Sequence, residues 1–392
     1  MGFVVKGKSS VYLKEEVLEG VYVAPVAGDA VEVLEDGVGF EYSRDEVERN
    51  LLSATIEVEA SRLGLKQVTG SVPVEFKAGL TEGAYPRENV LYKSLLGGTR
   101  QISTNTTTKT GNTASVLKIQ DADISKFKKN DIILVKQANQ YALRPIAEVD
   151  TTLGAAEITL AIPLDAAPAD NVVIGKSALY YHKDGAPSFS TTHYIGGAIK
   201  ETVEGCRSIS ASLESWEGGA VPSFNFSVEA LDLEQFAETL PVPLTPNFAN
   251  EALPPVILGA CVWINGVKVS YNSLTLNLEN TKAEVLSACS QSGKVGSRFT
   301  QFMTTGEIAP YMDDDNVDRF TAFNTNDDIS VFGYAYNPTS TVGEIEQAIA
   351  FWIPQAKITT MPNGDQDGIM TNQISFKAYK KDGEDTVFLG FV

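Results

Sequence analysis

Apolar and polar residues alternate at period two along much of this 392-residue chain. The alternation is clear in SATIEVE, residues 53–59, and in VTGSVPVEF, residues 68–76. Period two places successive side chains on opposite faces of a strand, so both stretches indicate half-buried β-strands. The SRLGLKQ between them predicts a loop bent at Gly64. We therefore expect a mainly β fold.

Two short stretches have helical spacing instead. In ENVLYKSLLGG, which begins at Glu88, the apolar positions share one side, and Gly97 ends the run as glycine does at helix C-termini. In MDDDNVDRFTAF, residues 312–323, Asp315 is the expected N-cap of a second helix. Its predicted apolar stripe consists of Val317, Phe320 and Phe323.

The order of predicted elements occurs twice. Residues 177–230 read as strand, turn, strand, polar hairpin and strand, and residues 328–379 read in the same order. Both end on a similar phrase, FNFS before Glu229-Ala230 and ISF before Ala378-Tyr379. The repetition indicates two tandem β-sandwich or half-barrel units, each with a short helix.

Residues 101–176 interrupt the first unit. The opening QISTNTTTKTGNTAS is rich in Thr, Asn and Ser and predicts a polar linker. Short strands at about ten-residue spacing follow, which predicts a small β-barrel or sandwich. These strands are expected at 114–119, 131–137, 141–149, 156–162 and 171–174.

A Pro-rich stretch, LPVPLTPNFANEALPP, lies between the two units. Its prolines exclude helix and internal strand, so it predicts a taut connector. The predicted segments are an N-terminal arm at 1–30, a first sandwich at 31–100 and 177–240, an inserted small β-barrel or decoration domain at 101–176, the connector at 241–253, and a second sandwich at 254–392.

The chain is strongly acidic, with a net charge of −19. This charge disfavours a nucleic-acid clamp, which holds phosphate with Lys and Arg, but suits a surface that DNA must pass without sticking. Cys206, Cys261 and Cys289 lack CxxC spacing and predict reduced, packed thiols. We expect neither a signal peptide nor a membrane span, because no apolar run has the required length.

No set of residues predicts catalysis. His182 and His193 lie on predicted strands, where a surface or core-edge position is the commoner interpretation than a general base. The acidic run from Asp313 to Asp318 lacks the glycine and the final glutamate of an EF-hand loop, so a solvated helix cap is preferred over a cation site. We therefore predict no enzyme activity, no cofactor and no metal site.

Several motifs in order carry a family resemblance. In KEEVLEGVYVAP, residues 14–25, an acidic residue precedes a glycine, an aromatic and a proline. A helix ending in LLG follows, then closing strands around Pro222 and Phe226, and the ISFKAY phrase repeats that close. Apart from about 101–176, the chain in this respect resembles the tail tube (major tail) proteins of long-tailed, siphovirus-like bacteriophages.

The resemblance implies a β-sandwich flanked by a helix, with subunits forming rings whose inner strands join into one barrel. The rings stack around a tape-measure protein, and the finished tube conducts DNA from head to host. The implied partners are the chain itself, the tape-measure protein, and the tail-terminator and tail-tip proteins, with transient non-specific passage of phage DNA and no membrane span. The expected location is the virion tail, after assembly in the host cytoplasm.

Family members with one sandwich form hexameric rings, so two sandwiches per chain predict trimeric rings with pseudo-sixfold symmetry. Hexameric rings are the alternative. The N-terminal arm and the loop at 60–66 would tie successive rings, and the inserted domain would decorate the tube exterior. The predicted inter-ring contact residues are Phe3, Val5, Tyr12, Tyr22, Leu63 and Leu65.

Other interpretations stay open. Another ring-forming tail component, a terminator or tail-tip protein, shares the sandwich but does not build long tubes. A surface β-sandwich adhesin needs an export signal. A carbohydrate-active β-sandwich enzyme would show turnover without forming assemblies.

Overall fold

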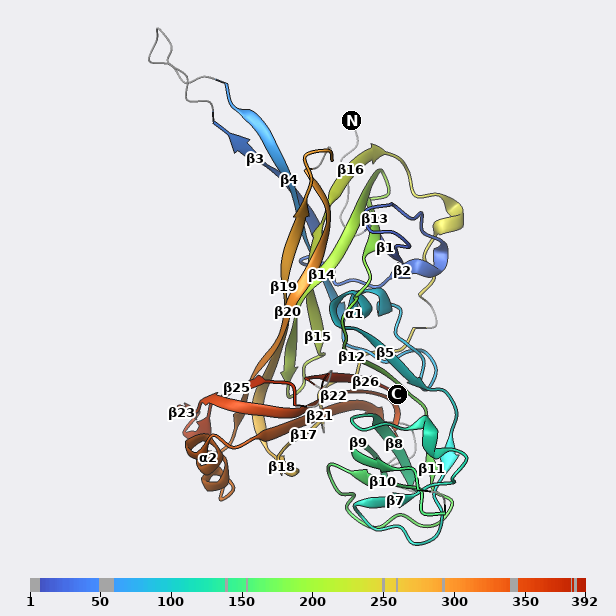
Figure 1. Ribbon diagram of the computed structural model, residues 1–392, viewed down its shortest axis with the longest axis vertical. Helices are drawn as coiled ribbons and strands as arrows, with labels where there is room; N and C mark the ends of the chain where they lie inside the picture. Colours follow the sequence, from blue (N-terminus) through green and yellow to red (C-terminus); the bar gives the residue numbers. More distant parts are fainter. Residues whose placement is uncertain are drawn as a thin grey trace.

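β-strands dominate the computed structural model of the protein (Figure 1). The structure describes residues 8–48, 60–137, 140–152, 154–248, 251–258, 260–290, 293–338, 345–381, 383 and 386–392. Within these residues the strands form an 18-stranded sheet, a six-stranded sheet and a two-stranded hairpin. The predicted mainly β class is confirmed.

The elements follow the labels of Figure 1. The large sheet contains β1 (Ser10–Glu15), β2 (Ala30–Val31), β3 (Gly39–Val47), β4 (Arg62–Glu75), β5 (Gly97–Ile102), β12 (Ser177–His182), β13 (Phe189–Ile195), β14 (Ile199–Glu217), β15 (Ser223–Ala230), β16 (Asp232–Ala237), β17 (Cys261–Ile264), β18 (Val267–Val269), β19 (Tyr271–Leu286), β20 (Lys294–Pro310), β21 (Ile329–Pro338), β22 (Ile345–Thr360), β25 (Ile374–Ala378) and β26 (Phe388–Phe391). The six-stranded sheet contains β6 (Thr106–Thr107), β7 (Val116–Lys118), β8 (Ile132–Gln137), β9 (Gln140–Asp150), β10 (Glu157–Leu160) and β11 (Val173–Ile174). The hairpin is β23 (Asn363–Gln366) with β24 (Ile369–Asn372), and the α-helices are α1 (Asn89–Leu96) and α2 (Asn316–Thr325).

One scheme of antiparallel pairings occurs twice in the large sheet. We call β1–β4 and β13–β16 the first set, and β17–β22 with β25 and β26 the second set. The pairings β1–β2, β1–β13, β13–β14, β14–β15, β14–β16, β15–β4 and β3–β4 correspond, in that order, to β17–β18, β17–β21, β21–β22, β22–β25, β22–β26, β25–β20 and β19–β20. α1 lies between β4 and β13, and α2 lies between β20 and β21. A further pairing, β14–β19, joins the two sets into one sheet.

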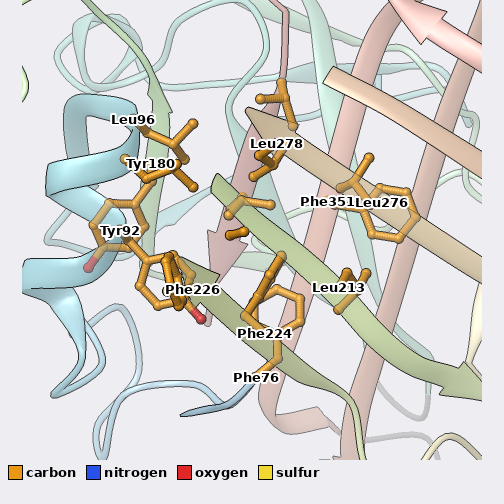
Figure 2. Close-up of a cluster of buried hydrophobic side chains, with 14 of the residues drawn as sticks. Phe76, Tyr92, Leu96, Tyr180, Leu213, Phe224, Phe226, Leu276, Leu278 and Phe351 are labelled. Atoms are coloured by element: carbon orange, nitrogen blue, oxygen red, sulfur yellow. The ribbon is translucent and has the colours of Figure 1, made fainter. Parts of the chain in front are cut away.

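A shared hydrophobic core lies against the joined sheet (Figure 2). Tyr92 of α1 packs edge-on against Phe224 and Phe226 of β15, with ring centroids 5.9 and 5.2 Å apart. Leu276 and Leu278 of β19 continue the same core into the second set. Because one cluster spans both sets, they form a single hydrophobic unit.

The prediction of a loop at 61–67 is wrong. Residues from Arg62 onward belong to β4, which pairs with β3 as far as Val47. A Cβ on Gly64 would come within 3.2 Å of the Val47 side chain, so this glycine marks a close approach inside the hairpin and not a bend. The strand predicted at 53–59 lies outside the described residues.

The polar linker predicted at 101–115 is also wrong, because β5, β6 and the start of the six-stranded sheet lie there. Thr106 and Thr108 are buried. The Thr106 hydroxyl donates to the Asp123 carboxylate at 2.6 Å, and the Thr108 hydroxyl donates to the Ala169 carbonyl at 3.1 Å. A β-branched side chain with a satisfied hydroxyl fits a strand, so polarity alone did not indicate a loop here.

The strands predicted between 114 and 174 are present as β7 to β11. In the sequence their sheet is inserted between β4 and β13 of the first set, but in space it packs against the second set. Ile132 and Leu134 of β8 lie in a cluster with Phe332 and Trp352 of β21 and β22. The Trp352 indole also donates to the Asn130 side chain at 3.1 Å.

Both predicted helices form, but of the predicted apolar stripe of α2 only Phe323 packs against the core, and the other two residues face outward. Val317 is 68% exposed and Phe320 is 51% exposed. The buried residues of α2 are Arg319 and Ala322, and the Arg319 guanidinium bonds to the Asp313 carboxylate. The small Ala322 allows the helix to approach β22, so the face that is buried is set by fit and by an ion pair.

Gly296 and Gly306 lie within β20. A Cβ on Gly306 would come within 2.4 Å of the Phe376 ring on the paired strand β25. Glycine therefore makes room for an aromatic side chain at this place in the sheet.

Candidate functional site: the polar sheet face and its open edges

Strand alternation gives the joined sheet an apolar face and a polar face. In β14, Ala211 and Leu213 point into the core, and Ser212 lies on the opposite side. Ser212 pairs with Asn225 of β15 on one side and with Asn277 of β19 on the other. Directly paired residues point to the same face, so the polar face continues from the first set into the second.

Short hydroxyl and amide side chains cover this polar face. The Ser71 hydroxyl donates to the Asn225 side-chain oxygen at 2.7 Å, and the Thr360 hydroxyl donates to the Ser375 hydroxyl at 2.9 Å. The short polar residues that the register places here are Ser71, Ser210, Ser212, Asn225, Ser227, Thr275, Asn277, Thr305 and Ser375. Such a surface is hydrated, and these short side chains carry no positive charge that would attract phosphate.

Charged residues of both signs lie on the polar face. The exposed acids there include Glu214, Glu217, Glu279 and Glu307 of β14, β19 and β20. At the far end, Lys357 of β22 lies directly opposite Lys377 of β25. Like charges in this arrangement repel. Lys357 forms an ion pair with Asp328 at 2.5 Å, and the hydrogen bond from this lysine holds the pKa of the Asp328 carboxyl below its usual range.

Two open edges of the sheet correspond to the β14–β19 junction; in the part of the chain that the structure describes, other strands such as β16 and β18 also pair on one side only. β3 pairs with β4 on one side, and no described strand pairs with its other side. β22 pairs with β21 as far as Ala356, and from Lys357 to Thr360 that side has no described partner, whereas β25 occupies the other side. In β14 the corresponding side is occupied, because β19 pairs with it from Ser210 to Glu217. The two open edges are therefore the counterparts of the β14–β19 junction.

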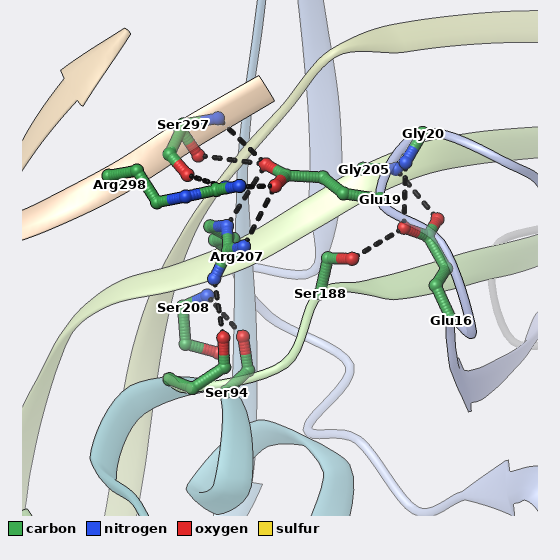
Figure 3. A network of polar contacts seen from close by, with 11 residues as sticks. Glu16, Glu19, Gly20, Ser94, Ser188, Gly205, Arg207, Ser208, Ser297 and Arg298 are labelled. Atoms are coloured by element: carbon green, nitrogen blue, oxygen red, sulfur yellow. Dashed lines mark hydrogen bonds and ion pairs between the residues drawn. The ribbon is translucent and has the colours of Figure 1, made fainter. Parts of the chain in front are cut away.

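A half-buried carboxylate ties the N-terminal segment to both strand sets (Figure 3). Glu19 accepts hydrogen bonds from Arg207 of β14 at 3.1 and 2.9 Å, and from the Ser297 backbone and the Arg298 guanidinium of β20, both at 2.8 Å. Burial raises the pKa of Glu19, but the bonds and charge of Arg207, together with Ser297 and Arg298, outweigh burial and hold this pKa below its usual value. The ionised carboxylate clamps β14 to β20.

Sequence reasoning missed this clamp, although Glu19 and Gly20 lie in the phrase that carried the family resemblance. Arg207 is 188 positions away along the chain, so no local pattern connects it to Glu19. The available signal was the glycine itself. Gly20 has φ +77°, and a Cβ there would come within 2.9 Å of Leu231, so the segment turns tightly over the sheet at this point.

The structure does not bring the predicted inter-ring residues together. Phe3 and Val5 lie outside the described residues. Tyr12 lies in β1 and is fully buried. Its hydroxyl donates to the Leu244 carbonyl, and its ring packs edge-on against Tyr194 at 6.0 Å. The Tyr12 side chain is therefore held inside its own chain and is not available to a second ring.

The other three predicted residues are more accessible. Leu63 is 69% exposed on the β3–β4 hairpin, which extends away from the body in Figure 1. Leu65 lies on the same hairpin beside Gly293, where a Cβ would come within 2.2 Å of the leucine side chain. The Tyr22 hydroxyl is 2.6 Å from the Thr192 hydroxyl. Contact of Tyr22, Leu63 and Leu65 with a second ring stays a prediction.

The two histidines lie in separate surroundings. His182 stacks on Phe302 with ring centroids 4.3 Å apart, and the buried His193 has Nδ1 3.3 Å from a Glu201 carboxylate oxygen. Among the described residues, no three His, Cys, Asp or Glu side chains are grouped to hold a metal ion. Neither described helix has the length and apolar character needed to cross a membrane.

Fold and site together define a class of protein: a β-rich structural subunit with a repeated strand scheme and open sheet edges. A family model described as phage tail tube protein matches residues 7–378. The chain therefore belongs to the phage tail tube family and is a structural protein of the virion tail, as its sequence predicted. No curated protein matches the chain.

Proposed function

We propose that this chain polymerises as stacked rings into the phage tail tube, around the tape-measure protein, and that the finished tube is the conduit for DNA ejection. The tail-terminator and tail-tip proteins would close its two ends. Support comes from the family match and from the two open edges of the joined sheet. Repeating the β14–β19 junction between chains would occupy both of these edges and close the joined strands into a barrel.

The repeated pairing scheme supports trimeric rings. Each chain contributes two strand sets, so three chains provide six and give pseudo-sixfold symmetry. The proposal keeps the predicted division into an N-terminal arm at 1–30, a first sandwich at 31–100 and 177–240, an inserted domain at 101–176, a connector at 241–253 and a second sandwich at 254–392, with one change: residues 10–15 of the arm form β1 and belong to the first sandwich.

The polar face is the surface that we assign to the bore. Its short hydroxyl and amide groups and its exposed Glu214, Glu279 and Glu307 suit passage of a polyanion, because acidic groups repel DNA at close range. The six-stranded sheet packs against strands of the second set away from this face, so it would decorate the exterior.

Electron microscopy of the purified chain tests this function. Tubes of uniform diameter are expected, with three chains per ring from helical reconstruction or mass per unit length. Six chains per ring would overturn the threefold arrangement. Single closed rings that never stack would instead favour a terminator or tail-tip protein, and a stable monomer at all concentrations would contradict the proposal.

A further inference from the structure

The β14–β19 junction inside the chain fixes a register that can be transferred to the open edges. In this junction Ser210 pairs with Glu279, and Ala211 pairs with Leu278. A second junction of the same kind, formed between two chains, would join β22 of one chain to β3 of the next. Identifying the residues that would face each other requires the equivalents of β14 and β19 residues in β22 and β3.

Equivalent positions on β14 and β22 follow from the matched closing strands. Phe226 of β15 pairs with Ala211, and Phe376 of β25 pairs with Ile358. One position earlier on β14 and β22, Ser210 pairs with Ser227 and Lys357 pairs with Lys377. Ile358 is therefore equivalent to Ala211, and Lys357 is equivalent to Ser210.

Equivalent positions on β3 and β19 follow across the next pairing. Phe226 pairs with Val72 of β4, and Phe376 pairs with Gly306 of β20. Two residues before these β4 and β20 positions, Gly70 pairs with Phe40 and Thr304 pairs with Leu278. Phe40 is therefore equivalent to Leu278, and the next residue, Glu41, is equivalent to Glu279.

We propose that Lys357 of one chain lies directly opposite Glu41 of the neighbouring copy, and that this pair of opposite charges selects the correct edges when a ring closes. We call this junction the seam. The inference rests on the proposed function, because it requires that chains join edge to edge. Ile358 would then lie opposite Phe40 of the neighbouring copy.

Charge complementarity supports a second copy of the chain as the partner of the β22 edge. Lys357 and Lys377 lie opposite each other, and Asp328 balances one of the two charges. Glu41 is exposed on β3 and would place a second acid beside them. The pair replaces Ser210 and Glu279 of the internal junction, where the first residue carries no charge. Opposite charges on directly paired strands stabilise the pairing.

The same charges disfavour incorrect pairings. β3 also carries the exposed Asp45 and Glu46, so two β3 edges would bring acids together. Two β22 edges would bring the lysines Lys357 and Lys377 together. Repulsion in both arrangements leaves the head-to-tail junction, which can propagate around a ring. Phe40 is only half-buried in the chain, and the seam would cover it beside Ile358, which is 7% exposed.

Charge reversal tests the seam. We expect Lys357→Glu and Glu41→Lys each to lower the fraction of chain that sediments as tubes by about tenfold or more, since like charges would then face each other. The variant with both reversals should recover to within about twofold of the wild-type fraction, because opposite charges meet again. Glu214→Lys on the same face and Lys118→Glu on the six-stranded sheet are matched controls, and both should assemble normally.

Each outcome separates the seam from the proposed function. If the wild-type chain forms no tubes, the proposed function fails and the seam fails with it. If wild-type tubes form and the single reversals assemble normally, the seam alone is overturned. It is also overturned if the double reversal stays unassembled while circular dichroism shows that it is folded.

A cross-linking experiment covers the case in which Lys357→Glu fails to fold because Asp328 loses its partner. Glu41→Cys and Lys357→Cys are combined with Cys289→Ser, which removes an exposed native thiol. Oxidised tubes should give linked chains on a denaturing gel, since directly paired strand residues are close enough for a disulfide. Glu214→Cys with Lys357→Cys is the control. Linking in the control alone would overturn the register.

Discussion

The two helices occupy equivalent places in the two strand sets but have different surroundings. On α1, the side chains of Leu91, Tyr92 and Leu95 are at most 1% exposed. On α2, Val317 and Phe320 are both more than half exposed. Both helices begin with Asn-Val and both present apolar residues at helical spacing, so the spacing of apolar residues does not explain the difference.

The difference comes from strands that reach α1 from elsewhere in the chain. Tyr180 of β12 and Phe391 of β26 pack on Tyr92, with ring centroids 5.1 and 5.3 Å away. β5 and β12 flank the six-stranded sheet in sequence, and the second set has no equivalent strands between Asn326 and Asp328. A helix can therefore be recognised from its own sequence, whereas its burial depends on what the rest of the chain supplies.

The largest effect should follow from emptying the core beneath α1. Tyr92→Ala removes a ring that contacts aromatic side chains of β12, β15 and β26, and we expect it to lower the free energy of unfolding by about 3–5 kcal/mol. Urea denaturation of the unassembled chain, followed by circular dichroism, measures this loss.

Tyr92→Phe is the matched control. The Tyr92 hydroxyl is buried without a hydrogen-bond partner among the described residues, so its removal should be neutral or slightly stabilising. A loss below about 1 kcal/mol for Tyr92→Ala would show that α1 is no more essential to the core than α2.

The residues that precede the two helices should also differ in their effect on how the free energy of unfolding depends on pH. Glu88 precedes α1 and is 1% exposed, whereas Asp315 precedes α2 and is exposed. Burial raises the pKa of Glu88 to about 8, despite the opposing charge of Lys77. The carboxyl is therefore protonated in the folded chain at neutral pH and ionised in the unfolded chain.

The sign of the effect follows from that difference. With a folded pKa above the unfolded one, the stabilisation is complete at low pH and is lost as pH rises toward 8. We expect the wild-type chain to lose about 3 kcal/mol through this group between pH 5 and pH 7.5. Glu88→Gln should remove this slope, as measured by urea unfolding at several pH values. Equal slopes in both proteins would contradict the assignment, and Asp315→Asn serves as the exposed control.

Local sequence patterns predicted the elements that a few neighbouring residues are enough to specify. Period-two alternation identified the core half of β4, and Gly97 correctly marked the end of α1, where it has φ +79°. The family phrases identified the tail tube class because they fall at turns and closing strands. These features are encoded within a few residues of each other.

Long-range pairing decided the features that local patterns missed. Residues 62–67 form strand because β3 pairs with them, and residues 101–102 and 106–107 of the Thr-rich stretch form strand because β12 and β11 pair with them. The Glu19 clamp depends on Arg207, which lies far away in sequence. The open edges needed the register of the whole sheet, since they are defined by the pairing that β14 has and β22 lacks.

The smallest effect should come from the exposed side of α2. Val317→Ser and Phe320→Ser each replace an exposed apolar side chain, and we expect the free energy of unfolding to change by no more than about 0.5 kcal/mol. Leu95→Ser on α1 is the matched substitution and should cost several kcal/mol, because Leu95 is 1% exposed in the shared core. Urea unfolding of the three unassembled variants gives the comparison directly. A loss above 1 kcal/mol for Phe320→Ser would mean that α2 uses this side chain within the chain, and the contrast between the two helices would then reduce to a difference of degree.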